Sequence, residues 1–584
     1  MDNHRKTRRR LAFMIFAVVA VTSLFLVRLV DIQIVSASEL NAQSLDKRAL
    51  SVKTYGVRGA ILDTNGVVLA SSVERYNITA SPRLVDSFKR KVDGETVIVS
   101  VAEAVSEISA VTGDDPAVIM ASITADATSD FAYVSKAVKL DVFLAVRELN
   151  IPWVWDELQP SRTYPNGSVA GNLIGFIGTD GPQAGLERTE SDCLDSVDGS
   201  SVFERGADGV RIPGSTITTK EAQDGGTLKL TIDSDFQWYV QQVVAERAGE
   251  LGADWATALV VRVKDGHLMA VADYPSVDPN NVEGVPKTAL GSLAFSTPYE
   301  PGSTMKALTV ASLIDAGAIT PATQIVAPGR LTLSSKDSIK DAWSHGDLRY
   351  TAAGALTFSS NTGISLLSQN LSAQQRYEYM LAFGLNQDTA VDFYGESSGL
   401  VRDYKDWDSV TNYTVGFGQG LQTTSAQIAG IYQTLGNDGV RVPLTLVEGC
   451  EWPDGTVTDV PSDEGVRVVS ESAARQTVEI MENVVTQGSF SSSLSMPGYR
   501  VAAKTGTAEI AEGGRYTDER VISVAGLIPA DDPEYAVVVT FGKPDTMKTS
   551  GAAAPTFKKI MTQIVKTFRV TPSSTTAPVI PLYW

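Results

Sequence analysis

The stretch that decides the fold is Glu300-Pro301-Gly302-Ser303-Thr304-Met305-Lys306, and a run of good helix formers at residues 307–316 follows it directly. The turn at Pro301-Gly302 predicts that Ser303 lies in the first turn of this helix, with Lys306 beside it on one face. A neutral lysine amine can take the proton of a serine hydroxyl at hydrogen-bond distance, and the N–H groups of a helix N-terminus can stabilise an oxyanion. The stretch therefore predicts a serine nucleophile with Lys306 as its base.

Two further motifs follow, and their order makes the pattern specific. They are Ser359-Ser360-Asn361 and Lys504-Thr505-Gly506-Thr507. Taken singly, each motif has an ordinary structural interpretation: a capping serine with a solvated lysine, a polar pair in a loop, and the end of an edge strand. In this order, Ser-x-x-Lys, Ser-x-Asn and Lys-Thr-Gly form a signature of penicillin-binding proteins and class A β-lactamases.

The composition is that of a globular protein, and the length of 584 residues suggests two or three domains. The net charge of −19 leaves no basic stripe to neutralise phosphates, so nucleic acid is not an expected partner. The three histidines, His4, His267 and His345, are too scattered for a zinc site or a His-based triad, and we expect them in turns and loops. Acid–base chemistry must therefore use lysine, serine, tyrosine or carboxylates.

The two cysteines give no clear signal. Cys193 and Cys450 are far apart in the chain and show no metal-binding spacing. We expect two separate thiols, and the sequence leaves a bridge between them open without supporting it.

A basic segment and an apolar run open the chain. Residues 1–10 hold five Arg and Lys against one acidic residue, and residues 11–27 carry no charge. This pattern predicts a transmembrane anchor with a cytoplasmic N-terminus and all later residues outside. A cleavable signal peptide with a processing site at Val35-Ser36-Ala37 is the alternative. The length of the run, together with Arg28 and Asp31 before that site, favours an uncleaved anchor.

Residues 35–225 mix short strands and turns and hold no catalytic constellation. Residues 58–70 predict a hairpin around Asn65-Gly66, and residues 97–111 carry apolar positions at helical spacing. Arg162-Thr163-Tyr164-Pro165 and Gly185-Leu186-Glu187 mark further turns, to which the residues alone assign no role.

A second region begins at a boundary near Gly225-Gly226. Its pattern predicts strands at both ends and helices between them. The predicted strands are residues 257–263, 268–273, 500–507, 521–528 and 535–541, and a closing helix starts at Pro555. This order predicts an α+β domain in which helices cover one antiparallel sheet and the Ser303 helix lies across it. Residues 571–584 are predicted to be a loose tail.

With these residues quoted, the chain resembles a class B penicillin-binding protein, a membrane-anchored D,D-transpeptidase that cross-links peptidoglycan. The resemblance covers nearly the whole chain. It rests on the nucleophile motif and on landmarks in both halves: Arg58-Gly59 with Asp63 and Asn65-Gly66, Gly185-Leu186-Glu187, Thr231-Ile232-Asp233 with Gln237, and residues 416–420 with Thr423-Thr424.

The predicted domain order follows from the anchor and from this resemblance. It places a cytoplasmic tail at residues 1–10, a transmembrane anchor at 11–34, and an extended mixed α/β pedestal, dimerisation-like and non-catalytic, at 35–225. A transpeptidase domain of the penicillin-binding-protein and β-lactamase type follows at 226–570, and the C-terminal tail at 571–584.

The resemblance also implies a role for each motif residue. Ser303 attacks the carbonyl between two D-alanines, and Lys306 is the base, with its pKa lowered by burial and by Lys504. Ser359 relays a proton to the leaving amine, and Asn361 binds the substrate amide and Lys306. Backbone N–H groups of Ser303 and Thr507 form the oxyanion hole, and Lys504 with Thr505, Gly506 and Thr507 binds the terminal carboxylate. No metal or organic cofactor is implied.

Other functions share parts of this pattern. A β-lactamase, a D,D-carboxypeptidase and a non-catalytic scaffold that activates a membrane glycan polymerase remain alternatives. Within the family, the Ser360-Asn361-Thr362-Gly363 context and the length resemble the septal FtsI-type branch more than the elongation branch. The resemblance implies stem peptides as substrates and β-lactams as inhibitors. It also implies a polymerase of the SEDS family (FtsW-type), with other divisome membrane proteins, as partners at the division site.

Overall fold

The computed structural model describes residues 2–37, 39, 49–92, 94–178, 180–204, 212, 214–462, 464–513 and 515–584. The chain divides into two compact units. The first combines Met1–Val57 with Ser196–Gly225, and the second combines Arg58–Asp195 with Gly226–Trp584. The part of the chain between residues 58 and 195 therefore groups with the C-terminal region, and each unit is described by itself below.

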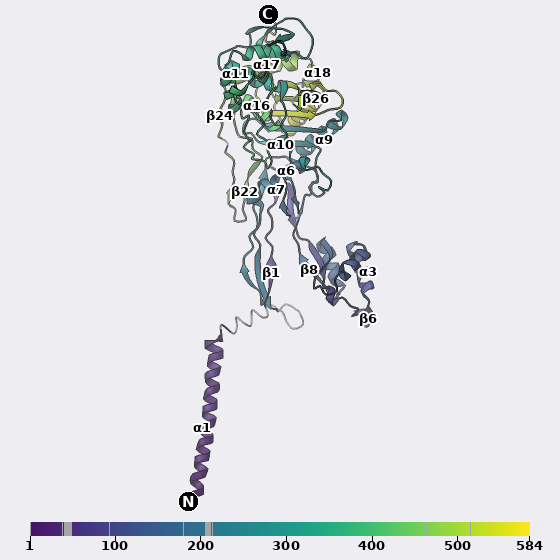
Figure 1. The fold of residues 1–584 in the computed structure, drawn as a ribbon, viewed down its shortest axis with the longest axis vertical. Helices are drawn as coiled ribbons and strands as arrows, with labels where there is room; N and C mark the ends of the chain where they lie inside the picture. The colour runs from purple at the N-terminus through teal and green to yellow at the C-terminus, as the bar shows by residue number, and fades with distance from the viewer. Residues whose placement is uncertain are drawn as a thin grey trace. The chain divides into compact units, whose positions relative to one another are not determined.

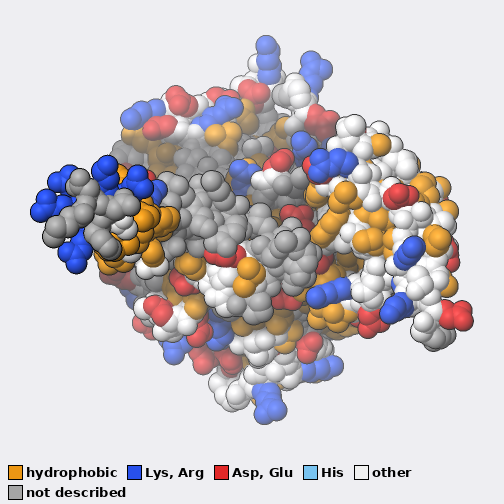
Figure 2. Space-filling view, turned by 90° about the horizontal axis from the view of Figure 1, so that it is seen from below, with side chains coloured by type: hydrophobic (Ala, Val, Ile, Leu, Met, Phe, Trp, Pro, Cys, Tyr) orange, Lys and Arg blue, Asp and Glu red, His pale blue; other side chains and the backbone are white. Residues whose placement is uncertain are grey.

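The first unit contains the N-terminal helix and a small sheet. Helix α1 (Asp2–Val30) continues into a π-helical turn at Asp31–Val35. Its apolar side chains are exposed, and the helix is long and apolar enough to cross a membrane. Figure 2 shows blue Lys and Arg side chains around one end of this helix and orange apolar side chains next to them. The helix thus fits a single-pass membrane protein.

The sheet of this unit is antiparallel in the order β1-β12-β13. Its strands are β1 (Ala49–Thr54), β12 (Gly199–Glu204) and β13 (Ile217–Lys220).

The second unit begins with the predicted hairpin. Strands β2 (Ile61–Leu62) and β3 (Val68–Val73) pair antiparallel on either side of Asn65-Gly66, where Gly66 adopts a φ of 83°. They belong to a six-stranded sheet with β9 (Ser161–Thr163), β14 (Thr227–Leu230), β22 (Val447–Glu451) and β23 (Val457–Thr458). Because β14 pairs with both β2 and β22, this sheet joins the region before residue 195 to the region after residue 226.

Residues 76–158 form a subdomain with its own core. The sheet β7-β4-β8 (Ala132–Val138, Tyr76–Ala80 and Val154–Leu158) packs against α3 (Val101–Thr112), α4 (Pro116–Thr124) and α5 (Leu140–Glu148). The predicted helix at residues 97–111 was wrong at its start. Residues 97–99 belong to strand β6 (Glu95–Val99), which pairs with β5 (Phe88–Val92), and the Ser100 side chain caps α3.

The C-terminal part is organised around the predicted antiparallel sheet, in the order β16-β15-β27-β26-β25. The strands are Leu268–Tyr274, Trp255–Arg262, Tyr535–Gly542, Arg515–Ile528 and Ala502–Glu512. Side chains of this sheet point alternately to its two faces, and each face packs into a hydrophobic cluster. One contains α9 (Ser234–Leu251) and α19 (Ala554–Thr567), and the other contains α11 (Lys306–Asp315), α16 (Ser425–Gly436) and α17 (Glu471–Gln487). Figure 1 shows these helices around the sheet, and the α+β prediction is confirmed.

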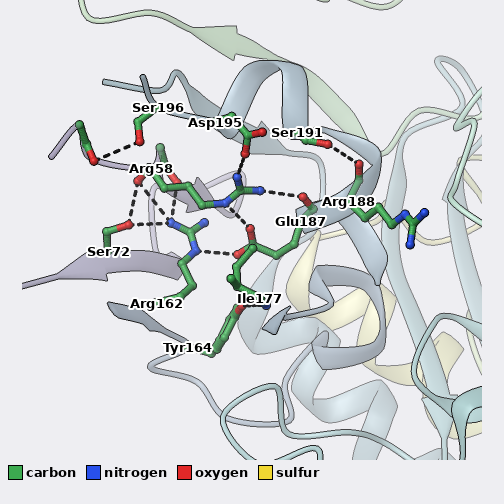
Figure 3. A network of polar contacts seen from close by, with 12 residues as sticks. Arg58, Ser72, Arg162, Tyr164, Ile177, Glu187, Arg188, Ser191, Asp195 and Ser196 are labelled. Carbon is green, nitrogen blue, oxygen red and sulfur yellow. Dashed lines mark hydrogen bonds and ion pairs between the residues drawn. The ribbon is translucent and has the colours of Figure 1, made fainter. Parts of the chain in front are cut away.

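Three turns that seemed unrelated in the sequence meet at one buried carboxylate (Figure 3). Glu187, whose side chain is fully buried, accepts hydrogen bonds from Arg58 Nε at 2.7 Å and from Arg162 Nε at 2.6 Å. Arg58 also pairs with Asp195, and Arg162 donates to the carbonyl of Gly59 at 2.7 Å. The two guanidinium groups therefore join the hairpin, β9 and the turn at Glu187 through one ion.

The expectation of two separate thiols was wrong. Cys193 and Cys450 form a disulfide, and both are buried. Cys450 lies on β22, which pairs with β14, and Gly226, just before β14, donates its N–H to the carbonyl of Cys193. Sequence distance hid this contact because sheet pairing brings the two cysteines together.

The loose tail was also a wrong prediction. Leu582 is buried, and its carbonyl accepts a hydrogen bond from the N–H of Thr351, whose hydroxyl donates to the carbonyl of Pro581. Tyr583 packs against the rings of Tyr350 and Phe358. The last residues are thus part of the domain.

Candidate active site

Ser303 lies in a short 3-10 turn, Gly302–Met305, that leads directly into α11. The α-helix therefore starts at Lys306, and Ser303, which was predicted to lie in its first turn, lies in the 3-10 turn just before it. Gly302 has a φ of 55°, and a Cβ there would lie 3.2 Å from the Cβ of Ala508 and from the carbonyl oxygen of Thr507. Glycine thus allows the nucleophile turn to lie close to β25.

Lys306 is completely buried, and its amine makes three contacts. Nζ donates to the carbonyl of Ser359 at 2.7 Å, to Ser359 Oγ at 3.1 Å and to Asn361 Oδ1 at 2.7 Å. Among the hydrogen bonds of the described residues, none joins Lys306 to Ser303. The pair predicted from i,i+3 spacing is therefore connected through Ser359.

Ser359 is the centre of the polar cluster. Its Oγ accepts from Lys306 and, at 2.9 Å, from Lys504 Nζ, and it donates to Ser303 Oγ at 2.9 Å. The residue adopts a φ of 57°, a conformation unfavourable for a serine, between α12 (Ala352–Thr357) and α13 (Asn361–Ser368). The left-handed turn places both the hydroxyl and the carbonyl of Ser359 within reach of Lys306.

The third motif lies on β25, opposite Ser359. Lys504 is completely buried and also donates to the carbonyl of Thr505 at 2.9 Å. A Cβ on Gly506 would lie 2.5 Å from Ser523 Oγ and 3.1 Å from Thr304 Cγ2, so glycine allows the strand to approach the nucleophile turn. Thr507 is exposed, and its hydroxyl accepts from the N–H of Ser550 at 3.1 Å.

Burial dominates the electrostatics of both lysines. It lowers the pKa of Lys306 well below the ordinary value. The neighbouring charge of Lys504 lowers that pKa further, whereas Asp341 raises it. Burial lowers the pKa of Lys504 to about 7. The site therefore holds amines that can be neutral near neutral pH, which is the state a base needs.

A second group of contacts encloses the nucleophile turn from the side of residues 415–420. The N–H of Gly302 donates to the carbonyl of Gly418 at 3.0 Å, and the N–H of Gly420 donates to Glu300 Oε1 at 3.0 Å. The Tyr516 hydroxyl donates to Glu300, and burial raises the pKa of that carboxyl. Tyr516 carried no sequence signal, because it reaches Glu300 through the pairing of β25 with β26.

The structure brings together every motif residue predicted from the sequence. Sequence patterns did not point to Lys340 or Asp341, which contact the Ser359–Asn361 turn from a segment about 20 residues earlier, or to His345, which contacts Asp341. Among the residues that the structure describes, no group of three or more His, Cys, Asp and Glu side chains is placed to bind a metal ion. The cluster is suited to acyl transfer through a serine hydroxyl.

Two protein families match the chain. The family described as the penicillin-binding protein transpeptidase domain matches residues 256–562, and the one described as the penicillin-binding protein dimerisation domain matches residues 53–230.

Named relatives align over nearly the full chain. Penicillin-binding protein PbpB of Mycolicibacterium smegmatis is 34% identical over 97% of this chain and 91% of its own length. Peptidoglycan D,D-transpeptidase FtsI of Escherichia coli K12 is 29% identical over 97% and 93%. The crystal structure of penicillin-binding protein 3 from Mycobacterium tuberculosis, complexed with aztreonam, superposes with a TM-score of 0.69 at 28% identity. That match covers 91% of this chain and 100% of the other.

Proposed function

Because the chain belongs to the class B penicillin-binding proteins, in which a dimerisation domain precedes a transpeptidase domain, we propose that Ser303 is the nucleophile of its peptidoglycan D,D-transpeptidase reaction. The enzyme cross-links stem peptides through an acyl-enzyme. One observation carries the assignment: hydrogen bonds run from Ser303 Oγ through Ser359 Oγ to the buried amines of Lys306 and Lys504.

Deprotonation of Ser303 uses this chain of hydroxyls. The Ser303 hydroxyl turns to donate to Ser359 Oγ, and the Ser359 hydroxyl donates to the neutral amine of Lys306. One proton then moves from Ser303 to Ser359 and another from Ser359 to Lys306. Asn361 Oδ1 and the carbonyl of Ser359 hold the resulting ammonium.

Acylation and transfer follow with the protons balanced. Ser303 Oγ bonds to the carbonyl carbon between the two D-alanines, the C–N bond breaks, and the leaving amine takes a proton from Lys306 through Ser359. The N–H groups of Ser303 and Thr507 hold the oxyanion, and Lys504 with the Thr505-Gly506-Thr507 segment holds the terminal carboxylate. An amine of a second stem peptide then takes the acyl group and returns a proton to Ser303.

The first experiment is labelling with a fluorescent penicillin, which the aztreonam complex of a relative supports as a probe. The full-length chain in detergent is compared with Ser303→Ala and with Ser335→Ala. Ser335 is an exposed serine of the same domain that has no hydrogen bond among the described residues. We expect a stable adduct on wild type and Ser335→Ala and none on Ser303→Ala. A folded wild-type protein that forms no adduct would contradict the proposal.

Three further observations distinguish the alternative functions. A label that appears and is quickly lost indicates a β-lactamase. Release of D-alanine without cross-linked product indicates a carboxypeptidase. Growth supported by Ser303→Ala in place of the wild-type gene indicates a scaffold.

The N-terminal helix anchors the enzyme by a single span, with the basic residues in the cytoplasm and the catalytic domain on the outer face. The positive charges before the apolar run support this orientation, and so does the disulfide, because disulfides persist in oxidising compartments. Thiol labelling from either side of intact cells, with a cysteine introduced at Ser335, tests the orientation: we expect labelling from outside only.

The enzyme acts in septal wall synthesis, beside a membrane glycan polymerase of the SEDS family (FtsW-type) and other divisome proteins. The similarity to FtsI and PbpB supports this branch over the elongation branch. Imaging a fluorescent fusion tests it: we expect signal at mid-cell, and signal along the side walls alone would assign the elongation branch. Co-purification of the polymerase with the anchored chain tests the partner.

A further inference from the structure

The carboxylate of Asp341 lies directly behind the catalytic turn. Asp341 follows strand β19 (Ser338–Lys340), and its side chain is fully buried. Oδ1 accepts from the N–H of Thr362 at 3.0 Å, and Oδ2 accepts from the hydroxyl of Ser360 at 2.7 Å. Ser360 and Thr362 are the two neighbours of Asn361, so one carboxylate holds the side chain before that residue and the backbone N–H after it.

The residue before Asp341 determines which way the Asn361 amide faces. Asn361 Nδ2 donates to the carbonyl of Lys340 at 3.1 Å, and this contact leaves Oδ1 to accept from Lys306 Nζ at 2.7 Å. Because a carbonyl accepts only, a flipped amide would lose both contacts. Lys340 and Asp341 together therefore fix the group that holds the Lys306 amine.

His345 contacts the same carboxylate. Its Nε2 lies 3.0 Å from Asp341 Oδ2, and its Nδ1 lies 2.6 Å from the carbonyl of Gly346. Both ring nitrogens therefore face oxygens, so the ring lies where it can donate to the carboxylate, and a positive charge on the ring would compensate the charge of Asp341.

We propose that Asp341 and His345 are positioning residues of the acylation step, which hold the Ser359–Asn361 turn against Lys306 and set the charge that the Lys306 amine faces. This inference rests on the proposed function, because it assigns the pair to the base of that reaction. Neither residue touches Ser303, and both act through the turn.

The charged and titratable groups around the turn are few. Lys504 faces Lys306 from β25, His345 and Tyr350 face Asp341, and Asp341 faces Lys306 from the end of β19. The Asp341 carboxylate raises the pKa of Lys306, opposing the effects of burial and of Lys504. A change in the charge at Asp341 is therefore expected to move the pH below which Lys306 is protonated and inactive as a base.

Two conservative variants give opposite predictions. Asp341→Asn removes the carboxylate charge and keeps an acceptor, so the rise of the acylation rate with pH is expected at lower pH. His345→Gln keeps a donor toward Asp341 but can carry no positive charge. The carboxylate is then uncompensated, and the rise is expected at higher pH. Each shift is of the order of one pH unit. Asp341→Ala, which frees the turn, is expected to lower the maximal acylation rate constant roughly 10²-fold.

The measurement is the acylation rate constant of the full-length protein with fluorescent penicillin as a function of pH, with the melting temperature recorded for each variant. Asp347→Asn is the matched control, since Asp347 is an exposed carboxylate of the same segment without an ion pair among the described residues. It should leave both the rate and its pH dependence unchanged.

Opposite shifts in folded Asp341→Asn and His345→Gln would support the inference, because loss of stability alone does not move a pH profile in two directions. Unchanged rates and profiles in both variants, or lowered melting temperatures with unchanged profiles, would overturn it. If Asp341→Asn does not fold, the direction of the His345→Gln shift decides. Failure of the wild-type protein to react would instead overturn the proposed function and this inference with it.

Discussion

At the scale of single residues, Lys504 illustrates how catalysis and stability conflict. Its amine is completely buried, and burial lowers its pKa to about 7 from an unfolded value of about 10.4. Between about pH 7 and pH 10.4 the unfolded chain therefore binds more protons than the folded chain. The destabilisation caused by the buried ammonium is largest below about pH 7 and fades as the pH approaches 10.4. Burying this amine beside Ser359 therefore lowers the stability of the domain.

Lys504→Met should accordingly stabilise the protein while abolishing its reaction with penicillin. The gain is expected to be largest below about pH 7, at most about 5 kcal/mol, and to shrink toward pH 10. Melting temperatures measured over this range check it, with Lys336→Met as the control because Lys336 is exposed. A gain that is independent of pH would show that burial of the charge is not its cause.

The site residues were predictable because they lie in three short motifs, and these motifs seldom occur by chance in this order. Hydrogen bonds connect Ser303, Ser359, Lys306 and Lys504, and Asn361 accepts from the Lys306 amine. The route through Ser359 was not predictable, because it depends on a left-handed φ at a serine and on which lysine reaches its hydroxyl. His345 was expected to be an ordinary loop residue, and only the folded chain brings it to Asp341.

At the scale of elements, the last residues of the chain support the catalytic turn. The ring of Tyr583 lies 5.4 Å from that of Phe358, the residue before Ser359, and 5.3 Å from that of Tyr350. Phe358 and Tyr350 also stack on each other. The three rings thus connect the C-terminal segment to the backbone that gives Ser359 its left-handed conformation.

Tyr583→Ala should therefore slow acylation as well as lower stability. Loss of two ring contacts is expected to cost about 1–2 kcal/mol, and a less constrained Phe358 should lower the acylation rate constant. Val579→Ala serves as the control, because Val579 is 89% exposed in the same segment. Unchanged acylation by folded Tyr583→Ala would show that the segment contributes to stability alone.

The elements were predictable to different degrees. The strands of the central sheet were found because apolar runs of six to eight residues, bounded by turns, indicate buried strands. The start of α3 was missed because apolar residues of β6 continue the helical spacing into a strand, and the hydrophobic pattern alone does not show where Ser100 caps the helix. The packing of residues 571–584 was missed because this segment is rich in Ser, Thr and Pro and has one buried side chain, that of Leu582.

At the scale of the whole molecule, one buried carboxylate connects segments that the sequence keeps more than 100 residues apart. Glu187 binds the guanidinium groups of Arg58 and Arg162, which are themselves largely buried. Removing the central ion would leave the buried Arg162 unpaired and Arg58 with Asp195 alone. The network thus depends on all three residues together.

Glu187→Ala is expected to lower stability by about 3–5 kcal/mol, with loss of folded protein at growth temperature. Limited proteolysis and the melting temperature check the effect, with Glu148→Ala as the control because Glu148 is an exposed carboxylate on α5. A Glu187→Ala protein as stable as the control would mean that the two arginines find other partners.

Reduction of the Cys193–Cys450 disulfide should also destabilise the second unit. The bond closes a loop of 257 residues, and such cross-links typically contribute about 2–4 kcal/mol. We expect dithiothreitol to lower the melting temperature of wild type but not that of a Cys193→Ala/Cys450→Ala protein. Equal sensitivity of the two proteins to dithiothreitol would exclude the disulfide as the cause.

This disulfide also sets an order of events in the life of the protein. The loop that it closes contains Ser303, Lys306, Ser359 and Asn361 but not Lys504. With the orientation proposed above, Cys193 crosses the membrane before Cys450, so the bond closes only after the first two motifs have crossed. Formation of the bond would then need an oxidant on the outer side of the membrane, although the bond does not involve the catalytic serine.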